Sequence, residues 1–162
     1  MGTPESNFWK LIKKNLPKKC HSTRIESRLP SGVPDCHFAW DGLVFWLELK
    51  TTKNNTLRIS PNQISWNSAY CLRGGFSFYL AKHTKTKDIY LFGGDQGPSL
   101  LDDGLRTKAL YQGTSFEDLF ATLRAYIKLT SMFQEDFATL RPCISMAQEI
   151  KKSPGKVPRD PR

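Results

Sequence analysis

The stretch 32–50 holds the feature that most constrains this chain, because two short apolar runs meet there at Asp41-Gly42. Asp-Gly between two strand-like runs is typical of a two-residue hairpin loop, since a type I′ turn needs positive φ at both central residues. Counting outward from this turn, the register places Asp35 opposite Glu48. We therefore expect a β-hairpin whose turn fixes which side chains face each other.

The predicted register brings two carboxylates and a lysine together. Opposed residues lie on one face of a sheet, and Lys50, two residues beyond Glu48, shares the face of Glu48 and Asp35. Two close carboxylates repel each other, and a bound divalent cation removes the conflict. Mg²⁺ prefers carboxylate oxygens and takes only one or two from a protein. The hairpin thus predicts a hard-metal site beside a lysine that could position a water or stabilise negative charge. A surface Glu48–Lys50 pair is the plainer alternative, but it leaves Asp35 unexplained.

Length and charge narrow the class of protein. The 162 residues predict a single domain over 1–150, with a core at 3–95 and a helical part at 114–150, followed by a basic disordered tail at 151–162. The net charge of +9 favours a polyanionic partner, with nucleic acid first, although a merely well-solvated surface is the alternative. No apolar run is long enough to span a membrane, so no membrane partner is expected. Four scattered cysteines without a CxxC pair predict reduced thiols and a cytoplasmic location.

The remaining patterns alternate between strand and helix, which predicts an α/β fold. In chain order we expect a helix over 3–16, an edge strand within 20–28, a strand over 43–52, a helix over 60–72, strands over 76–83 and 89–92, a long loop over 95–113, a core helix over 114–129 and a second helix over 132–150. Pro142 should break the last helix. The eight residues that begin at Phe120 return at Phe137 with six identical, which we interpret as a local duplication and not as a solenoid.

Two polar residues outside the hairpin each allow two readings. Glu5 lies in the first turn of the first helix, where a carboxylate is favourable, but it also heads the inward apolar stripe and could approach the metal. Gln63 completes a capping box with Ser60, but its helix follows the strand of Glu48, so its amide could also point into the site.

Together these residues resemble the PD-(D/E)xK nuclease superfamily. The resemblance is carried by Val33-Pro34-Asp35, by Glu48-Leu49-Lys50, and by Ser60-Pro61-Asn62-Gln63 followed by Trp66. It is closest to the virus-type replication–repair nuclease branch, which is akin to archaeal-type Holliday junction resolvases, and it covers roughly residues 5–83. It implies a restriction-endonuclease-like core with a central mixed β-sheet flanked by helices, and it leaves the C-terminal helices as additions.

The resemblance also implies roles for single residues. Asp35 and Glu48, with the backbone carbonyl of Leu49, would bind Mg²⁺ or Mn²⁺, and Lys50 would orient the attacking water. Gln63 matches a glutamine that follows the core motif, and Glu5 matches an acidic residue of the first helix that can join the metal site. No organic cofactor is expected. The basic residues expected to contact DNA are Lys13, Lys14, Lys18, Lys19, Arg28, Lys53 and Arg58.

The function expected from this set is that of a metal-dependent DNA endonuclease, and specifically of a Holliday junction resolvase. Two cuts across a two-fold junction need two sites, which a C₂ homodimer supplies. A restriction-like, flap or single-strand nuclease keeps the fold and changes the substrate. An inactive, basic DNA-binding module is the alternative from another class. A phage is one candidate source of such a protein.

Overall fold

A computed structural model describes residues 2–25 and 32–152, with side chains described up to residue 135. Arg28 and the tail from residue 153 onward lie outside the described residues. The strands are β1 (His21–Arg24), β2 (Cys36–Trp40), β3 (Leu43–Thr52), β4 (Ser77–His83), β5 (Ile89–Gly93) and β6 (Tyr111–Gly113). The helices are α1 (Pro4–Lys14), α2 (Pro61–Leu72), α3 (Gly97–Asp103) and α4 (Phe116–Lys152), with short 3₁₀ turns at Gly94–Gln96 and Gly104–Arg106.

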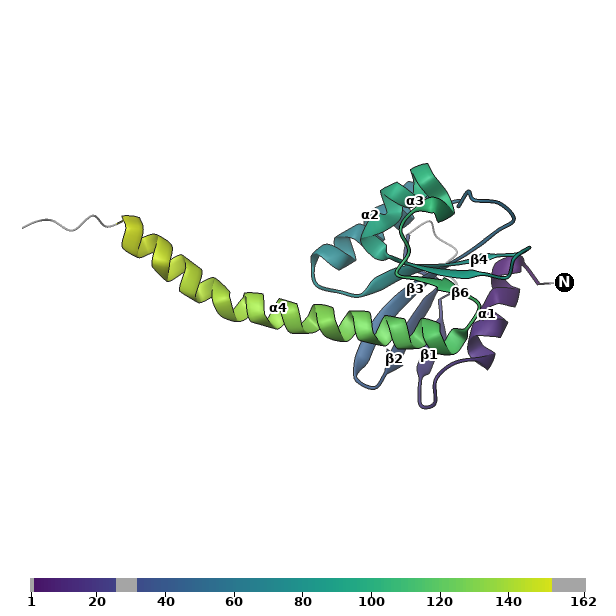
Figure 1. The fold of residues 1–162 in the computed structure, drawn as a ribbon, viewed down its shortest axis with the longest axis horizontal. Helices are drawn as coiled ribbons and strands as arrows, with labels where there is room; N and C mark the ends of the chain where they lie inside the picture. The colour runs from purple at the N-terminus through teal and green to yellow at the C-terminus, as the bar shows by residue number, and fades with distance from the viewer. Residues whose placement is uncertain (1, 26–31, 153–162) are drawn as a thin grey trace, which may run out of the picture. The chain divides into compact units, whose positions relative to one another are not determined.

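The six strands form one sheet in the order β1-β2-β3-β4-β5-β6. β3 and β4 run parallel, and every other neighbouring pair is antiparallel. The parallel pair is joined through α2, as a parallel connection requires. Helices lie on both faces of the sheet (Figure 1). The prediction of an α/β fold with a central mixed sheet flanked by helices is confirmed.

The hairpin forms in the predicted register. Asp41 and Gly42 both adopt positive φ, 49° and 77°, as a type I′ turn requires. Trp40 pairs with Leu43, and the pairing runs outward to Cys36 opposite Leu47. A side chain at residue 42 would meet no atom within 4 Å. Glycine is favoured there because of the backbone conformation alone.

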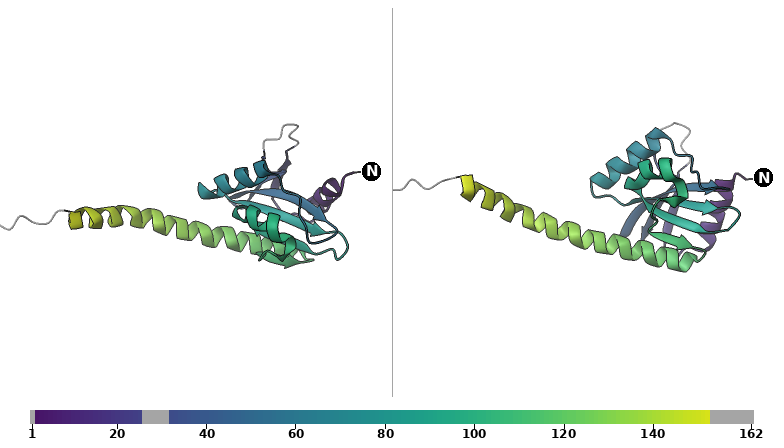
Figure 2. Two further views of the ribbon diagram at one scale, coloured as in Figure 1. Left: turned by 90° about the horizontal axis from the view of Figure 1, so that it is seen from above. Right: turned by 45° about the horizontal axis from the view of Figure 1, so that its top comes forward.

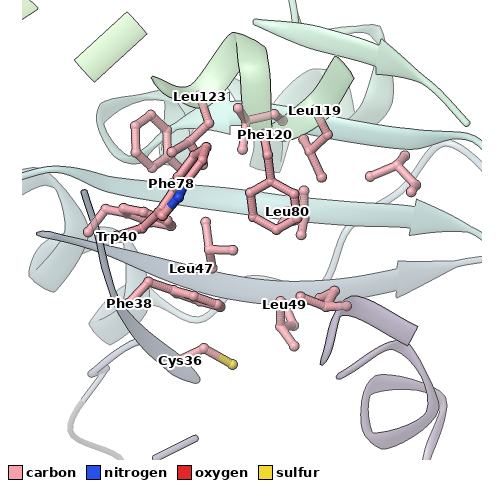
Figure 3. Packing of buried hydrophobic residues seen from close by; sticks show 14 of the residues in the cluster. Cys36, Phe38, Trp40, Leu47, Leu49, Phe78, Leu80, Leu119, Phe120 and Leu123 are labelled. Atoms are coloured by element: carbon pink, nitrogen blue, oxygen red, sulfur yellow. The ribbon is translucent and has the colours of Figure 1, made fainter. Parts of the chain in front are cut away.

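The core is split between the two faces of the sheet. On one face α1 and the start of α4 pack against the central strands, and Figure 3 shows Phe38, Leu49, Phe78, Leu119 and Leu123 meeting there. On the other face lie α2 and α3 (Figure 2). A second cluster forms there around Leu57, Ile59, Tyr79, Phe92, Leu100 and Leu105. Because β3 is central and its side chains alternate, Glu48 and Lys50 point to the α2 face.

The prediction of a long loop over residues 95–113 is wrong. This stretch holds two 3₁₀ turns, α3 and β6. Pro98 lies in the first turn of α3, where its missing N–H is no loss. Leu100 is fully buried and Leu105 is 8 % exposed. Elements this short show too little periodicity to be recognised from the sequence. They are stabilised instead by the burial of their side chains in the folded protein.

The prediction of two separate C-terminal helices is also wrong. α4 runs without interruption from Phe116 to Lys152, past the expected end near residue 129 and past Pro142. Proline removes one backbone hydrogen bond from a helix interior, but its neighbours are mostly good helix formers such as Ala, Leu, Met and Gln. The chain divides into two compact units, Met1–Ile127 and Lys128–Arg162. No helix in the described part of the chain is both long and apolar enough to cross a membrane.

Candidate active site

A cavity of about 640 Å³ opens at the carboxyl end of β3. Its walls come from the first turn of α1, the residue before β2, the end of β3 and the loop that follows, and the start of α2. All the residues predicted for catalysis or metal binding line it: Glu5, Asp35, Glu48, Leu49, Lys50 and Gln63. The fold thus brings together, from four segments, a set that was predicted from the sequence. The chemical roles of these residues stay predictions.

Asp35 is fixed against β3 by a backbone donor. The N–H of Leu49 donates to Asp35 Oδ2 at 2.8 Å, while the Asp35 carbonyl accepts from the N–H of Ile25 at 2.7 Å. Burial raises the pKa of the Asp35 carboxyl, and the Leu49 N–H and the Lys50 charge oppose that rise. The carboxylate is therefore held at the edge of the cavity in one orientation, beside the Leu49 backbone.

Glu48 is the most constrained group of the site, since only 1 % of it is exposed. Its Oε1 accepts from Lys50 Nζ at 2.9 Å and from the amide nitrogen of Gln63. Its Oε2 is buried and has no hydrogen-bond partner among the described residues. Burial, and then the neighbouring Asp35 carboxylate, raise the pKa of Glu48 to about 7. An orphaned carboxylate oxygen of this kind is destabilising unless a proton or a cation satisfies it.

The donors of the cavity fit a hard divalent cation. Two carboxylates, Asp35 and Glu48, line the same cavity, and one oxygen of Glu48 is left open. Mg²⁺ commonly takes one or two carboxylates from a protein and fills its other positions with water and substrate oxygens. No three His, Cys, Asp or Glu side chains among the described residues gather closely enough to hold one ion.

The Gln63 side chain serves both of the purposes considered for it. Its Oε1 accepts from the backbone N–H of Ser60 and from Lys50 Nζ, each at 3.0 Å. Its own backbone N–H donates to the Ser60 hydroxyl at 3.3 Å, which completes the predicted capping box. Because the amide nitrogen reaches Glu48, one side chain caps α2 and contacts both charged residues of the site.

The start of α2 is itself anchored by buried polar contacts. Asn67, which is fully buried, donates to the carbonyl of Gln63 at 2.8 Å and accepts from the Ser77 hydroxyl of β4. Gly32 has φ of 74°, and a Cβ there would lie 2.2 Å from the carbonyl oxygen of Asn62. The segment that leads to Asp35 therefore packs directly on the first turn of α2, and only glycine fits at that contact.

Glu5 reaches the cavity from the opposite face of β3. Its Oε1 accepts from the Thr51 hydroxyl at 2.7 Å. Thr51 follows Lys50 and points to the α1 side, because side chains alternate along a strand. Thr51 was not predicted as a site residue, although its place next to Lys50 at the strand end was the available signal. Whether Glu5 contributes to a metal site stays a prediction.

The basic residues predicted to contact DNA divide into two groups. Lys53 and Arg58 are exposed and line the cavity. Lys13, Lys14, Lys18 and Lys19 are exposed at the end of α1 and in the following turn, and they line no part of the cavity. The second group could contact only phosphates outside the cavity.

Comparison with known proteins gives distant structural matches. No family model matches the chain, and no curated protein sequence matches it either. A Holliday junction resolvase from Archaeoglobus fulgidus aligns at 16 % identity over 55 % of this chain and 72 % of its own, with a TM-score of 0.42. A bacterial homing endonuclease aligns at 18 % identity over 61 % of this chain and 71 % of its own, with a TM-score of 0.39. Both proteins are nucleases, but at these values the function has to be argued from the residues of the site.

The buried Glu48 predicts a specific dependence of stability on pH. Its folded pKa of about 7 lies above its ordinary value of 4.5, so its contribution to the free energy of unfolding is complete below about pH 4.5 and is lost as the pH rises through 7. Glu48→Gln should abolish this loss, which is roughly 3 kcal/mol by pH 8. Urea unfolding in EDTA at pH 5 and pH 8 measures the difference between the two proteins.

Asp103→Asn, which changes an exposed acid on α3, is the matched control and should behave as the wild type. Added Mg²⁺ at pH 8 should restore stability to the wild type and leave Glu48→Gln unchanged. If the free energy of unfolding changes with pH equally in the wild type and in Glu48→Gln, the Glu48 carboxylate does not destabilise the fold at pH 8.

Proposed function

We propose that this protein is a metal-dependent endonuclease that hydrolyses phosphodiester bonds in DNA, and that its substrate is a four-way junction. The observation that carries the proposal is the buried Glu48 carboxylate, one oxygen of which is bound by Lys50 and Gln63 while the other is open. A buried acid in this state is a poor structural element and a good metal ligand.

We assign each residue a role in the proposed reaction from its contacts. Asp35, Glu48 and the Leu49 carbonyl would hold Mg²⁺ or Mn²⁺. When bound, such an ion neutralises charge on a phosphate and lowers the pKa of a water. Lys50 Nζ, held by Glu48 at 2.9 Å and by Gln63 at 3.0 Å, is placed to donate to a water or to a phosphate oxygen. Gln63 thereby acts as a positioning residue for Lys50.

Charge supports DNA as the partner. The chain carries a net charge of +9, and exposed Lys53 and Arg58 line the same cavity as the buried acids. Acids inside and cations around them are the arrangement expected for a phosphate that must approach a bound metal ion. Binding should accordingly weaken with salt.

Two other functions remain as outcomes of the test. A flap, single-strand or restriction-like nuclease would use the same residues on another DNA structure. A pure DNA-binding module would need the positive charge but not the buried Glu48, whose burial costs stability. The intact acid–acid–lysine set therefore favours an enzyme.

The homodimer required for two symmetric cuts has a candidate interface in α4. Leu129, Met132 and Phe133 are exposed at 57 %, 63 % and 63 %, which is unusual for large apolar side chains on one short stretch. From Phe133 onward the apolar residues Phe137, Leu140 and Ile144 follow at steps of four, three and four residues. This is the spacing of a two-helix coiled coil, so we propose that this part of α4 pairs with its copy.

Cleavage of a synthetic four-way junction in Mg²⁺, mapped on all four strands, tests the function. The wild type should produce paired symmetric nicks, while Asp35→Asn and Glu48→Gln should reduce cleavage at least a hundredfold and retain DNA binding in a gel-shift assay. Asp103→Asn should cut as the wild type does. Preferred cutting of a flap, single strand or linear duplex would reassign the substrate, and undiminished cleavage by Asp35→Asn would refute the proposed site.

The positioning role of Gln63 is tested by a pair of variants. Gln63→Ala and Ser60→Ala each break the capping box and should destabilise α2 by about 1 kcal/mol. Only Gln63→Ala also releases Lys50, so kcat should fall in this variant at unchanged KM for DNA, while Ser60→Ala should keep the wild-type kcat. Equal kcat values in the two variants would show that Gln63 acts only as a helix cap and does not position Lys50.

The dimer is tested by charge substitution on α4. Phe133→Glu should raise the dimer dissociation constant at least tenfold, as measured by light scattering, and should turn paired nicks into single ones. Leu101→Glu changes another exposed leucine, on α3, and should leave the dimer intact. A wild-type protein that is monomeric at micromolar concentration would rule this interface out.

A further inference from the structure

A second cavity, of about 250 Å³, lies beside the main one. The two share Pro4, Thr51 and Thr84 in their walls, so the second cavity begins where the first ends. The acids of the main cavity do not line it. Its charged lining residues are instead Lys82 and Lys87, neither of which belongs to the residues predicted for DNA binding.

Lys82, near the end of β4, is only half exposed. Its Nζ lies 5.8 Å from the centre of the Phe8 ring of α1. Burial, and then the nearby charge of Lys87, lower the pKa of the Lys82 ammonium. Neither lysine forms an ion pair with a carboxylate among the described residues. The two cations therefore share a small cavity in which no carboxylate is a lining residue.

The backbone holds the second lysine in place. Lys87 has φ of 70°, and its Nζ donates to the Thr84 carbonyl at 2.7 Å. The opposite wall is the first turn of α1, with Pro4 and Asn7. The N-terminal end of an eleven-residue helix carries partial positive charge and adds to the field of the two lysines. The two lysines and the start of α1 thus favour an anion in the second cavity.

We propose that the second cavity binds a backbone phosphate of the DNA strand next to the phosphate that is cut in the main cavity. The proposal rests on the proposed function. Because the two cavities meet at Thr51 and Thr84, one strand can place consecutive phosphates in them, one over the acids and one between the lysines. Lys82 and Lys87 would then fix the position of the strand relative to Lys50 without taking part in the reaction.

Two methionine variants, one double and one single, test the proposal, since methionine keeps an unbranched stem against neighbours such as Phe8 and removes the charge. Lys82→Met with Lys87→Met in the full-length chain should raise the Kd for junction DNA roughly tenfold and lower the slope of log K against log salt by about 1. Lys85→Met, an exposed lysine of the same turn that lines neither cavity, should change Kd less than twofold. Binding is measured by fluorescence anisotropy in EDTA, so that cleavage plays no part.

A chemical substitution in the DNA identifies the phosphate itself. Single neutral methylphosphonates are placed at each position around the mapped cut. One position adjacent to the cut should weaken the wild type roughly tenfold and leave the double lysine variant unaffected. Equal losses at every position in both proteins, or a double variant that binds as the wild type does, would overturn the proposal while leaving the nuclease activity standing. Lysine-dependent binding by a wild type that cuts no DNA would instead refute the proposed function and retain the phosphate site.

Discussion

The burial of the Glu48 carboxylate is the constraint on which the rest of this structure depends. β3 is a central strand with helices over both faces, so a charged side chain on it leaves water when the sheet is covered. Lys50 and Gln63 satisfy one oxygen and leave the other open. The folded chain can resolve this in two ways, by protonation of the acid or by a cation beside it. The open oxygen is therefore destabilising to the fold at neutral pH, and under the proposed function a bound cation would satisfy it.

The arrangement of α2 follows from that constraint. Its first turn must deliver an amide to Glu48 and Lys50, and the same amide caps the helix. Asn67 and the close contact at Gly32 fix the depth of the turn against β4 and against the segment before Asp35. A helix start placed one residue earlier or later would lose both the cap and the contact with the site. Local helix energetics and the chemistry of the site thus select the same geometry.

The parts that could be predicted from sequence are those set by local interactions. The Asp41-Gly42 turn determines its own register, and the Ser60–Gln63 box determines where α2 begins. Lys82 and Lys87 could not be found in this way, because their importance comes from the packing of α1 against the ends of β3 and β4, which no local pattern encodes. α3 was missed for the related reason that burial of Leu100 holds a helix too short to show periodicity. Pro142 caused the opposite error, because it predicted a break that α4 does not have. A helix can lose one hydrogen bond and continue.

The two cavities differ in the charges that line them, and under the proposed function this difference would couple the binding of metal and DNA. The main cavity is lined by three acids, Glu5, Asp35 and Glu48, and by three cations, Lys50, Lys53 and Arg58. The charged residues that line the neighbouring cavity are two lysines, which attract a phosphate regardless of metal. In the proposed function, the second cavity would therefore hold a DNA strand whether or not a cation occupies the main cavity. By linkage, a cation that admits the phosphate to the main cavity is in turn bound more tightly once the phosphate is there. Under the proposed function, metal and substrate would therefore strengthen each other's binding, and the open oxygen of Glu48 is the group that a cation would satisfy.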